Sequence, residues 1–167
     1  MPKLPPALRK KLLAAILSGA SLLGITATYT GYWEGKVNTT YLDPVKIPTI
    51  CYGHTGPDVK PGMYKTDAEC LALLEKDLGG AFQAIDRYVT APLTDGQRVA
   101  LASFIYNVGV GKFRKSTLLK LINAGKMPAS CKEYPRWIRA GGEVLPGLRD
   151  RRNADEWLCT FDLPKAD

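Results

Sequence analysis

The pattern of hydrophobic and polar positions separates an uncharged N-terminal segment from a longer amphipathic part. Residues 1–11 carry four basic residues and no acidic one, whereas residues 12–33 contain no charged residue. Twenty-two uncharged residues can span the hydrocarbon core of a bilayer as a helix, and the basic flank predicts that the N-terminus stays in the cytoplasm. The segment has only seven Leu and Ile residues against eight Gly, Ser and Thr. We therefore expect a marginally stable insertion from which the segment can escape.

Three interpretations of residues 12–33 are open. A cleaved signal peptide fits the basic-then-apolar layout, but the apolar run is long for one and ends without a clear Ala-x-Ala. The other two are a permanent membrane span and an anchor that later leaves the membrane.

After residue 34 the pattern predicts strands and turns, and after residue 66 it predicts helices. Thr66 and Thr94 each open a capping box, with Glu69 and Gln97 three positions later. A helical stripe follows the first box, and Gly79–Gly80 in its middle leaves open whether that helix bends or breaks. The stripe consists of Leu71, Leu74, Leu78, Phe82 and Ile85. Further helices are expected at residues 94–109, 116–124, 129–139 and 146–159.

The segment between Trp33 and Thr55 contains the residue types that a glycosidase needs. Glu34 follows an apolar run, so partial desolvation is expected to keep it protonated as a general acid. Asp43 lies beside Pro44 in a polar turn and is expected to stay ionised, and Thr49 follows six positions later. The plainer interpretation is a surface Glu, a turn Asp and a β-branched strand residue without a catalytic task.

Three motifs carry a resemblance to a known family. The spacing Glu-x8-Asp-x5-Thr followed by Tyr-Gly-His, the run at residues 103–113 and the run at residues 146–152 resemble the T-even type of phage lysozyme, glycoside hydrolase family 24. The N-terminal segment resembles that of the signal-anchor-release endolysins. The resemblance implies an α+β, mostly helical lysozyme-like fold with a small N-terminal lobe holding a short β-sheet, a larger helical C-terminal lobe, and a weakly hydrophobic helix in front.

The resemblance also implies a division of the chain. Residues 1–33 would form the signal-anchor-release segment and residues 34–167 the catalytic domain. Within that domain we expect a hairpin lobe at residues 34–65, a linking helix region at residues 66–90 and a helical lobe at residues 91–167.

The activity implied is that of an inverting lysozyme (muramidase), which hydrolyses the β-1,4 bond between N-acetylmuramic acid and N-acetylglucosamine in peptidoglycan. Glu34 is implied as the acid, with Asp43 and Thr49 positioning the water. Asn107 falls where the family has an amide facing the substrate, although a helix-end Asn without a task is the alternative. His54, the single histidine, is expected to support the fold around the cleft.

A basic residue of the last helix is implied to approach the catalytic Glu. Arg151 is the candidate, although the register also allows Leu148 at that position. Without the resemblance, Arg149, Arg151 and Arg152 are expected on a solvated helix face. Trp137 and Trp157 are expected in the core rather than stacked on sugars.

The resemblance also implies a location and an activation step. The chain is expected in the host inner membrane, with the catalytic domain in the periplasm, and then free in the periplasm after release. Glu34 follows residues 12–33 directly, so insertion would hold it at the membrane surface, and release would activate the enzyme.

The net charge and the cysteine pattern limit the classes of partner and metal that the sequence predicts. The net charge of +7 comes from scattered Lys and Arg, which does not indicate nucleic-acid binding and favours the carboxylates of peptidoglycan as the anionic target. A zinc site is not expected, because no CxxC or Cys/His pairing appears in the sequence. We also expect a monomer that needs no cofactor.

The four cysteines allow three disulfide connectivities, and free buried thiols are the alternative. The pairing that closes the smallest loops is Cys51 with Cys70 and Cys131 with Cys159.

Two other functions use the same sequence features. One is a non-catalytic protein that binds the cell wall or perturbs membranes through residues 12–33. The other is a transglycosylase that uses Glu34 alone and leaves 1,6-anhydro ends. The joint presence of Glu34, Asp43 and Thr49 argues against both.

Overall fold

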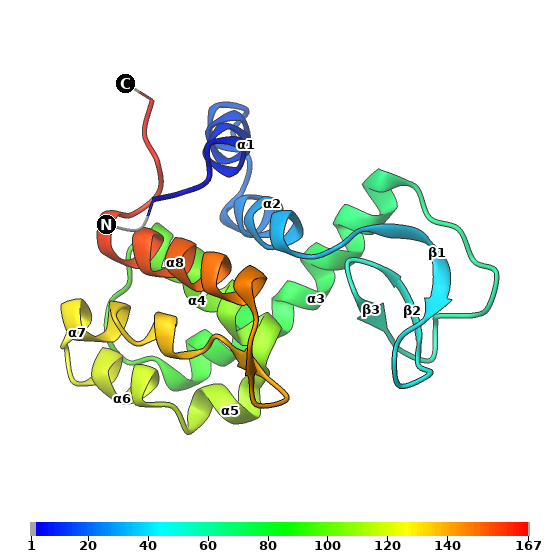
Figure 1. Ribbon diagram of the computed structural model, residues 1–167. Helices are drawn as coiled ribbons and strands as arrows, with labels where there is room; N and C mark the ends of the chain where they lie inside the picture. Colours follow the sequence, from blue (N-terminus) through cyan, green and yellow to red (C-terminus); the bar gives the residue numbers. More distant parts are fainter. Residues whose placement is uncertain (1–2, 167) are drawn as a thin grey trace.

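The computed structural model describes residues 3–166, arranged as a large helical lobe and a small lobe built on a three-stranded antiparallel sheet (Figure 1). The long helix α3 runs from the sheet lobe into the helical lobe. The helices are α1 (Pro6–Leu17), α2 (Leu22–Trp33), α3 (Asp67–Tyr88), α4 (Asp95–Val108), α5 (Val110–Arg114), α6 (Thr117–Asn123), α7 (Met127–Cys131), the 3-10 helix η1 (Tyr134–Arg136) and α8 (Pro146–Phe161). The strands are β1 (Val37–Leu42), β2 (Pro48–Cys51), β3 (His54–Thr55), β4 (Arg139–Ala140) and β5 (Glu143–Val144). The predicted α+β fold is confirmed.

The N-terminal segment forms two helices where one was expected. The chain turns after α1 at Gly19, whose φ of 77° suits glycine, and the Ser21 side chain caps α2 by accepting the N–H of Gly24. Leu12 and Tyr29 are fully buried in the same hydrophobic core as α4 and α8. Among residues 3–166, no helix combines the length and hydrophobicity that a membrane crossing requires.

Helix α3 confirms the first capping box and resolves the question left by the two glycines. Thr66 and Glu69 make both reciprocal hydrogen bonds, and the helix continues through Gly79 and Gly80 without a break. The buried side of the helix differs slightly from the predicted stripe, because Leu71 is 37% exposed. The buried residues of this helix are Cys70, Leu74, Leu78, Ala81, Ala84 and Ile85.

Helix α4 is the central element of the helical lobe. It begins with the second predicted capping box, Thr94 and Gln97, and its residues from Val99 to Ile105 are buried. Gly109, at a φ of 92°, ends the helix directly after the surface-exposed turn that carries Asn107. Asn107 therefore lies in the exposed last turn of α4, just before Gly109 separates this helix from α5.

The helix predicted at residues 129–139 is wrong. The chain forms α7, then η1, and then the hairpin of β4 and β5. Pro135 has no N–H for a helical hydrogen bond and ends the helical pattern. Gly141 and Gly142, both at positive φ, form the two-residue turn of the hairpin. Trp137 packs edge-on against Phe104, at 5.2 Å between ring centroids, in the predicted core position.

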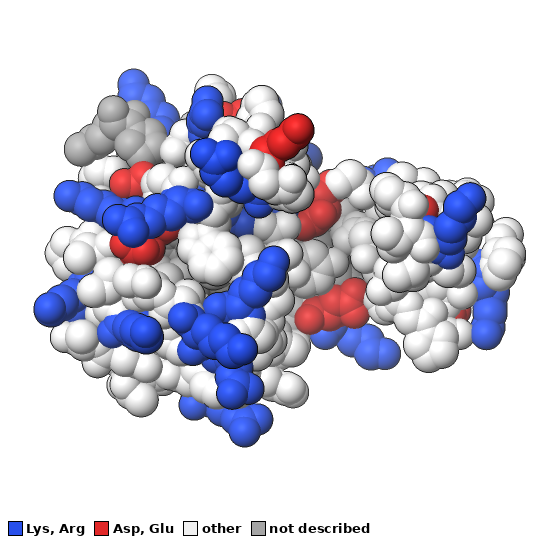
Figure 2. Space-filling view, turned by 60° about the horizontal axis from the view of Figure 1, so that its bottom comes forward, with Lys and Arg blue, Asp and Glu red and all other residues white. Residues whose placement is uncertain are grey.

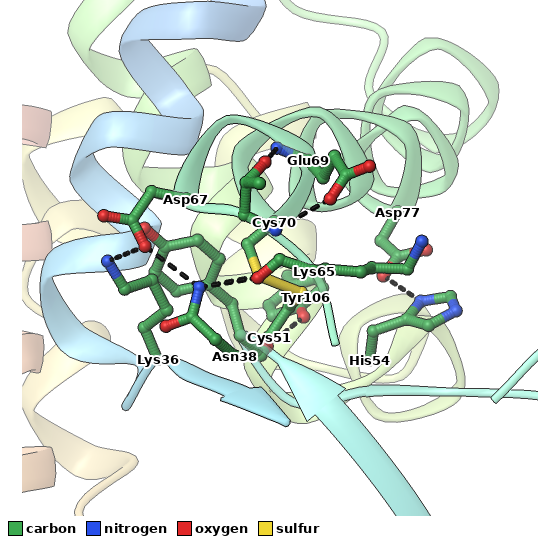
Figure 3. Close-up of a disulfide and its surroundings, with 12 residues drawn as sticks. Lys36, Asn38, Cys51, His54, Lys65, Asp67, Glu69, Cys70, Asp77 and Tyr106 are labelled. Atoms are coloured by element: carbon green, nitrogen blue, oxygen red, sulfur yellow. Dashed lines mark hydrogen bonds and ion pairs between the residues drawn. A yellow bond between two sulfur atoms is a disulfide. The ribbon is translucent and has the colours of Figure 1, made fainter. Parts of the chain in front are cut away.

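Two disulfides join elements that are distant in the sequence. Cys51 at the end of β2 is bonded to Cys70 in α3 (Figure 3). Cys131 in α7 is bonded to Cys159 in α8. This is the predicted pairing. The first disulfide attaches the small sheet to the linking helix, so it helps to fix the position of one lobe against the other.

Candidate active site

A pocket of about 380 Å³ lies where α2, α3, α4 and the sheet lobe meet. Its lining combines residues from both lobes, three of which were predicted as site residues: Glu34, His54 and Asn107. The full lining is Glu34, Tyr52, Gly53, His54, Thr55, Asp77, Tyr106 and Asn107. In the space-filling view, acidic side chains gather in the narrow region between the two lobes, whereas Lys and Arg cover the surface of the helical lobe (Figure 2).

Glu34 is placed by the end of α2. It is the first residue beyond the helix, and its backbone N–H still donates to the carbonyl of Thr30. Its side chain is 24% exposed, and Oε1 accepts a hydrogen bond from Nη1 of Arg151 at 2.8 Å. The surroundings of Glu34 are therefore not only apolar, as expected from the sequence, because the buried guanidinium of Arg151 lies against its carboxyl group.

The arginines of α8 correct the expectation of a solvated face. Arg149 is exposed, but Arg151 and Arg152 are buried. Arg151, rather than Leu148, reaches Glu34, and its Nη2 also donates to Oγ of Ser103 at 3.1 Å. A buried guanidinium needs such partners, so α8 contributes to the site through its inner face.

Thr49 and Asp43 are not among the residues that line the pocket. Thr49 in β2 is 4% exposed and pairs directly with Thr55 of β3, which does line the pocket. Side chains of directly paired residues project from the same face of a sheet, so the side chains of Thr49 and Thr55 lie on one face. Its Oγ1 donates to the carbonyl of Ile47 at 2.9 Å.

Asp43 is held by the turn that follows β1. Its Oδ1 accepts the backbone N–H groups of Val45 and Ile47, both at 2.9 Å. Asp side chains commonly stabilise turns in this way. The predicted polar turn is therefore present, and Oδ2 makes no hydrogen bond within residues 3–166.

His54 joins the sheet to α3. Its Nδ1 lies 2.6 Å from Oδ2 of Asp77 (Figure 3). Its Nε2 lies 3.0 Å from Oδ2 of Asp58. Burial disfavours the charged imidazolium, but the hydrogen bonds to Asp77 and Asp58 outweigh that effect and raise the pKa of His54 above its ordinary value. These contacts agree with a supporting role.

Tyr106 lines the pocket, although no sequence motif marked it as a site residue. Tyr106 donates its hydroxyl to the carbonyl of Tyr52 at 2.8 Å and thereby joins α4 to the sheet lobe. Burial, followed by the charges of Glu34 and Asp77, raises the pKa of Tyr106 far above the ordinary tyrosine value. A lone aromatic residue in a helix is usually a core residue, so only the tertiary structure identifies it.

Asn107 is held by a second arginine. Arg152, fully buried, donates Nη2 to Oδ1 of Asn107 and Nη1 to Oδ2 of Asp155, while its Nε donates to the carbonyl of Trp137 at 3.1 Å. Asp155 lies three positions after Arg152, a spacing at which helical side chains meet. That spacing was visible in the sequence, but its connection to Asn107 was not.

A helical lobe and a small sheet lobe, with a glutamate at the pocket between them, define a lysozyme-like glycoside hydrolase. The chain belongs to the phage lysozyme family, whose family model matches residues 31–155. The SAR-endolysin of bacteriophage PS119 is 42% identical over 160 residues, covering 93% of this chain and 96% of that protein. The SAR-endolysin of Enterobacteria phage P21 is 41% identical over 162 residues, covering 95% and 98%.

A solved structure extends the comparison to the fold. The crystal structure of a mutant of P22 lysozyme superposes with a TM-score of 0.72 and 33% sequence identity, covering 80% of this chain and 94% of that one.

Proposed function

We propose that the protein is a phage endolysin with lysozyme activity, which hydrolyses the β-1,4 bond between N-acetylmuramic acid and N-acetylglucosamine in peptidoglycan. The observation that carries the proposal is the Glu34–Arg151 pair at the pocket between the lobes, within the region matched to the phage lysozyme family. The SAR-endolysins that resemble the chain over nearly its whole length support the same assignment.

The proposed reaction is an inverting hydrolysis. Glu34 donates a proton to the glycosidic oxygen as the bond to the anomeric carbon breaks. Asp43 and Thr49 position a water whose oxygen forms the new bond to that carbon, and Asp43 takes up the proton that the water loses. The unpaired Oδ2 of Asp43 and the pairing of Thr49 with Thr55, which lines the pocket, support these roles. Asn107 binds the N-acetyl group.

The substitution Glu34→Gln tests the assignment. It removes the transferable proton while preserving the shape of the side chain, so we expect the rate of release of new reducing ends from purified peptidoglycan to fall by about 10²- to 10⁴-fold. Glu143→Gln, in the exposed hairpin, is the matched control and should retain wild-type activity. Substantial activity in the Glu34 variant would contradict the assignment. Products that end in 1,6-anhydro sugars would indicate a transglycosylase instead.

We also propose that residues 1–33 hold the enzyme in the host inner membrane before release, with the N-terminus in the cytoplasm and residues 34–167 in the periplasm. Insertion is incompatible with the packing of Leu12, Ile25 and Tyr29 in the core, and it would keep Glu34 at the bilayer surface. Release from the membrane would therefore allow the core and the site to assemble together. The name SAR-endolysin, given to several relatives, supports this sequence of events.

Release is expected when the membrane is depolarised, so fractionation of cells with and without an uncoupler tests it. We expect the chain in the membrane fraction without the uncoupler and in the soluble periplasmic fraction after the uncoupler has depolarised the membrane. A chain that stays with the membrane in both conditions is a permanent anchor.

A further inference from the structure

A buried chain of polar contacts connects α2 to the pocket through α8. The hydroxyl of Tyr29 donates to Oδ1 of Asp155 at 2.6 Å, and Asp155 accepts Nη1 of Arg152 through its other oxygen. Tyr29, Arg152 and Asp155 are all 0% exposed. Their chain of contacts ends at Asn107, which lines the pocket.

The contacts of Arg152 determine which way the Asn107 amide faces. Each of the three guanidinium nitrogens of Arg152 donates a hydrogen bond, to Asp155, to Asn107 and to the carbonyl of Trp137. Because a guanidinium has no acceptor atom, Asn107 must turn its amide oxygen toward Arg152. The N–H groups of Asn107 then remain for a ligand, which must present an acceptor such as the carbonyl oxygen of an acetamido group.

We propose that Tyr29 and Asp155 are positioning residues, which couple the docking of α2 to the orientation of the Asn107 amide that binds the N-acetyl group of the substrate. The inference rests on the proposed function, because it takes the substrate to be an N-acetylated glycan. It adds a step to the proposed release, since the helix that ends just before Glu34 also carries Tyr29, whose hydroxyl completes this network.

The physical reason for the coupling is the burial of Asp155. A buried carboxylate that loses a hydrogen-bond donor is costly, so Asp155 is stable in this position only when Tyr29 is docked. Burial, followed by the negative charge of Asp155, raises the pKa of Tyr29 well above its ordinary value, which keeps its hydroxyl protonated as a donor. Without that donor, Asp155 and Arg152 are expected to rearrange, and Asn107 loses the contact that orients it.

A double-mutant cycle between Tyr29 and Asn107 tests the coupling. Tyr29→Phe removes one hydroxyl and keeps the ring, and we expect kcat/KM for peptidoglycan to fall about five- to tenfold. In the Asn107→Ala background the same substitution should cause no further fall. Tyr32→Phe is the matched control, because Tyr32 lies on the same helix and its hydroxyl makes no hydrogen bond within residues 3–166.

The cycle separates positioning from general stabilisation. All measurements are made well below the midpoint of thermal unfolding of each variant, so that a loss of stability alone leaves kcat/KM unchanged. Wild-type activity in Tyr29→Phe, or effects of the two substitutions that multiply, would overturn the inference. Asp155→Asn is the second variant, and its effect should also disappear in the Asn107→Ala background.

The side-chain amide resonances of Asn107 provide a measurement that does not depend on activity. In ¹⁵N-labelled protein they should shift in Tyr29→Phe and stay unchanged in Tyr32→Phe. Unchanged resonances in a folded Tyr29→Phe protein would reject the coupling. A wild-type protein that releases no reducing ends would reject the proposed function, and the resonances would still decide the coupling.

Discussion

Gly96 shows how tightly the end of the chain closes against α4. A Cβ atom at this position would lie 2.6 Å from the Cα atom of Asp162, and Oδ1 of Asp162 already accepts the N–H of Gly96 at 2.6 Å. The backbone of residue 162 therefore leaves no space for a side chain at residue 96.

Gly96→Ala is expected to lower the free energy of unfolding by about 1–3 kcal/mol, because the backbone of Asp162 must move. Gly79→Ala is the matched control: Gly79 lies within α3 with no atom within 4 Å of the added Cβ, so alanine should raise the free energy of unfolding by about 0.5–1 kcal/mol. Urea denaturation measures both. Equal stability of the Gly96 variant and the wild type would contradict the close packing.

His54 makes the stability of the protein depend on pH. Since its pKa is raised in the folded state, the stabilisation by Asp77 and Asp58 is complete below the ordinary histidine pKa of about 6.5 and is lost as the pH rises through the raised value.

The free energy of unfolding of the wild type, minus that of His54→Gln, should therefore shrink from about pH 6 to about pH 8. Urea denaturation at a series of pH values measures this difference. A difference that stays constant over that range would show that the charge of His54 does not contribute.

At the scale of elements, the turn between α1 and α2 distinguishes the folded protein from the proposed inserted form. A helix that spans a bilayer must be continuous to satisfy its backbone hydrogen bonds. The folded protein instead requires a turn at Gly19, with a φ that other residues rarely adopt. The same residues thus favour different backbone conformations in the two environments.

Gly19→Ala is expected to favour the membrane-inserted form and to delay lysis, because alanine stabilises a continuous helix and disfavours the turn. Gly24→Ala is the matched control, since it changes hydrophobicity equally while Gly24 is already helical and tolerates a Cβ with contacts of 3.6 Å or longer. Fractionation and the time to lysis measure the effect. The same delay in both variants would attribute it to hydrophobicity alone.

At the scale of the whole molecule, positive charge is distributed unevenly. Residues 96–132 contain seven Lys and Arg residues and no Asp or Glu. They form α4 to α7, and basic side chains are prominent on this part of the helical lobe (Figure 2). An anionic polymer in the cleft would experience attraction from this side of the protein.

The rate of peptidoglycan hydrolysis should therefore fall as salt rises from about 0.05 to about 0.3 M. The double variant Lys112→Glu, Lys115→Glu should show a weaker salt dependence. Lys3→Glu, Lys10→Glu changes the net charge equally at other exposed positions and is the control. Identical salt dependence in both double variants would show that only the net charge matters.

The sequence predicted local structure well wherever neighbouring residues determine it. Both capping boxes and the start of the last helix at Pro146 agree with the structure. The predicted disulfide pairing, which joins residues farther apart, also agrees. The helix predicted at residues 129–139 did not form, because Pro135 cannot supply the N–H that a continuous helix needs. The roles of Glu34, Asp43 and Thr49 stay predictions, and of the three only Glu34 lines the pocket.

The sequence by itself determined the helices that begin with a capping box, the end of α4 near Gly109, and the family to which the motif around Glu34 belongs. Only the tertiary structure decided that Arg151 faces Glu34, that Arg152 holds Asn107, and that the uncharged N-terminal segment fills the core. The physical reason is the distance along the sequence between the interacting residues. Caps and turns depend on hydrogen bonds between residues a few positions apart, whereas a buried charged side chain contacts its partner only when distant helices pack together. Arg151 and Glu34 are 117 positions apart, and no local pattern links them.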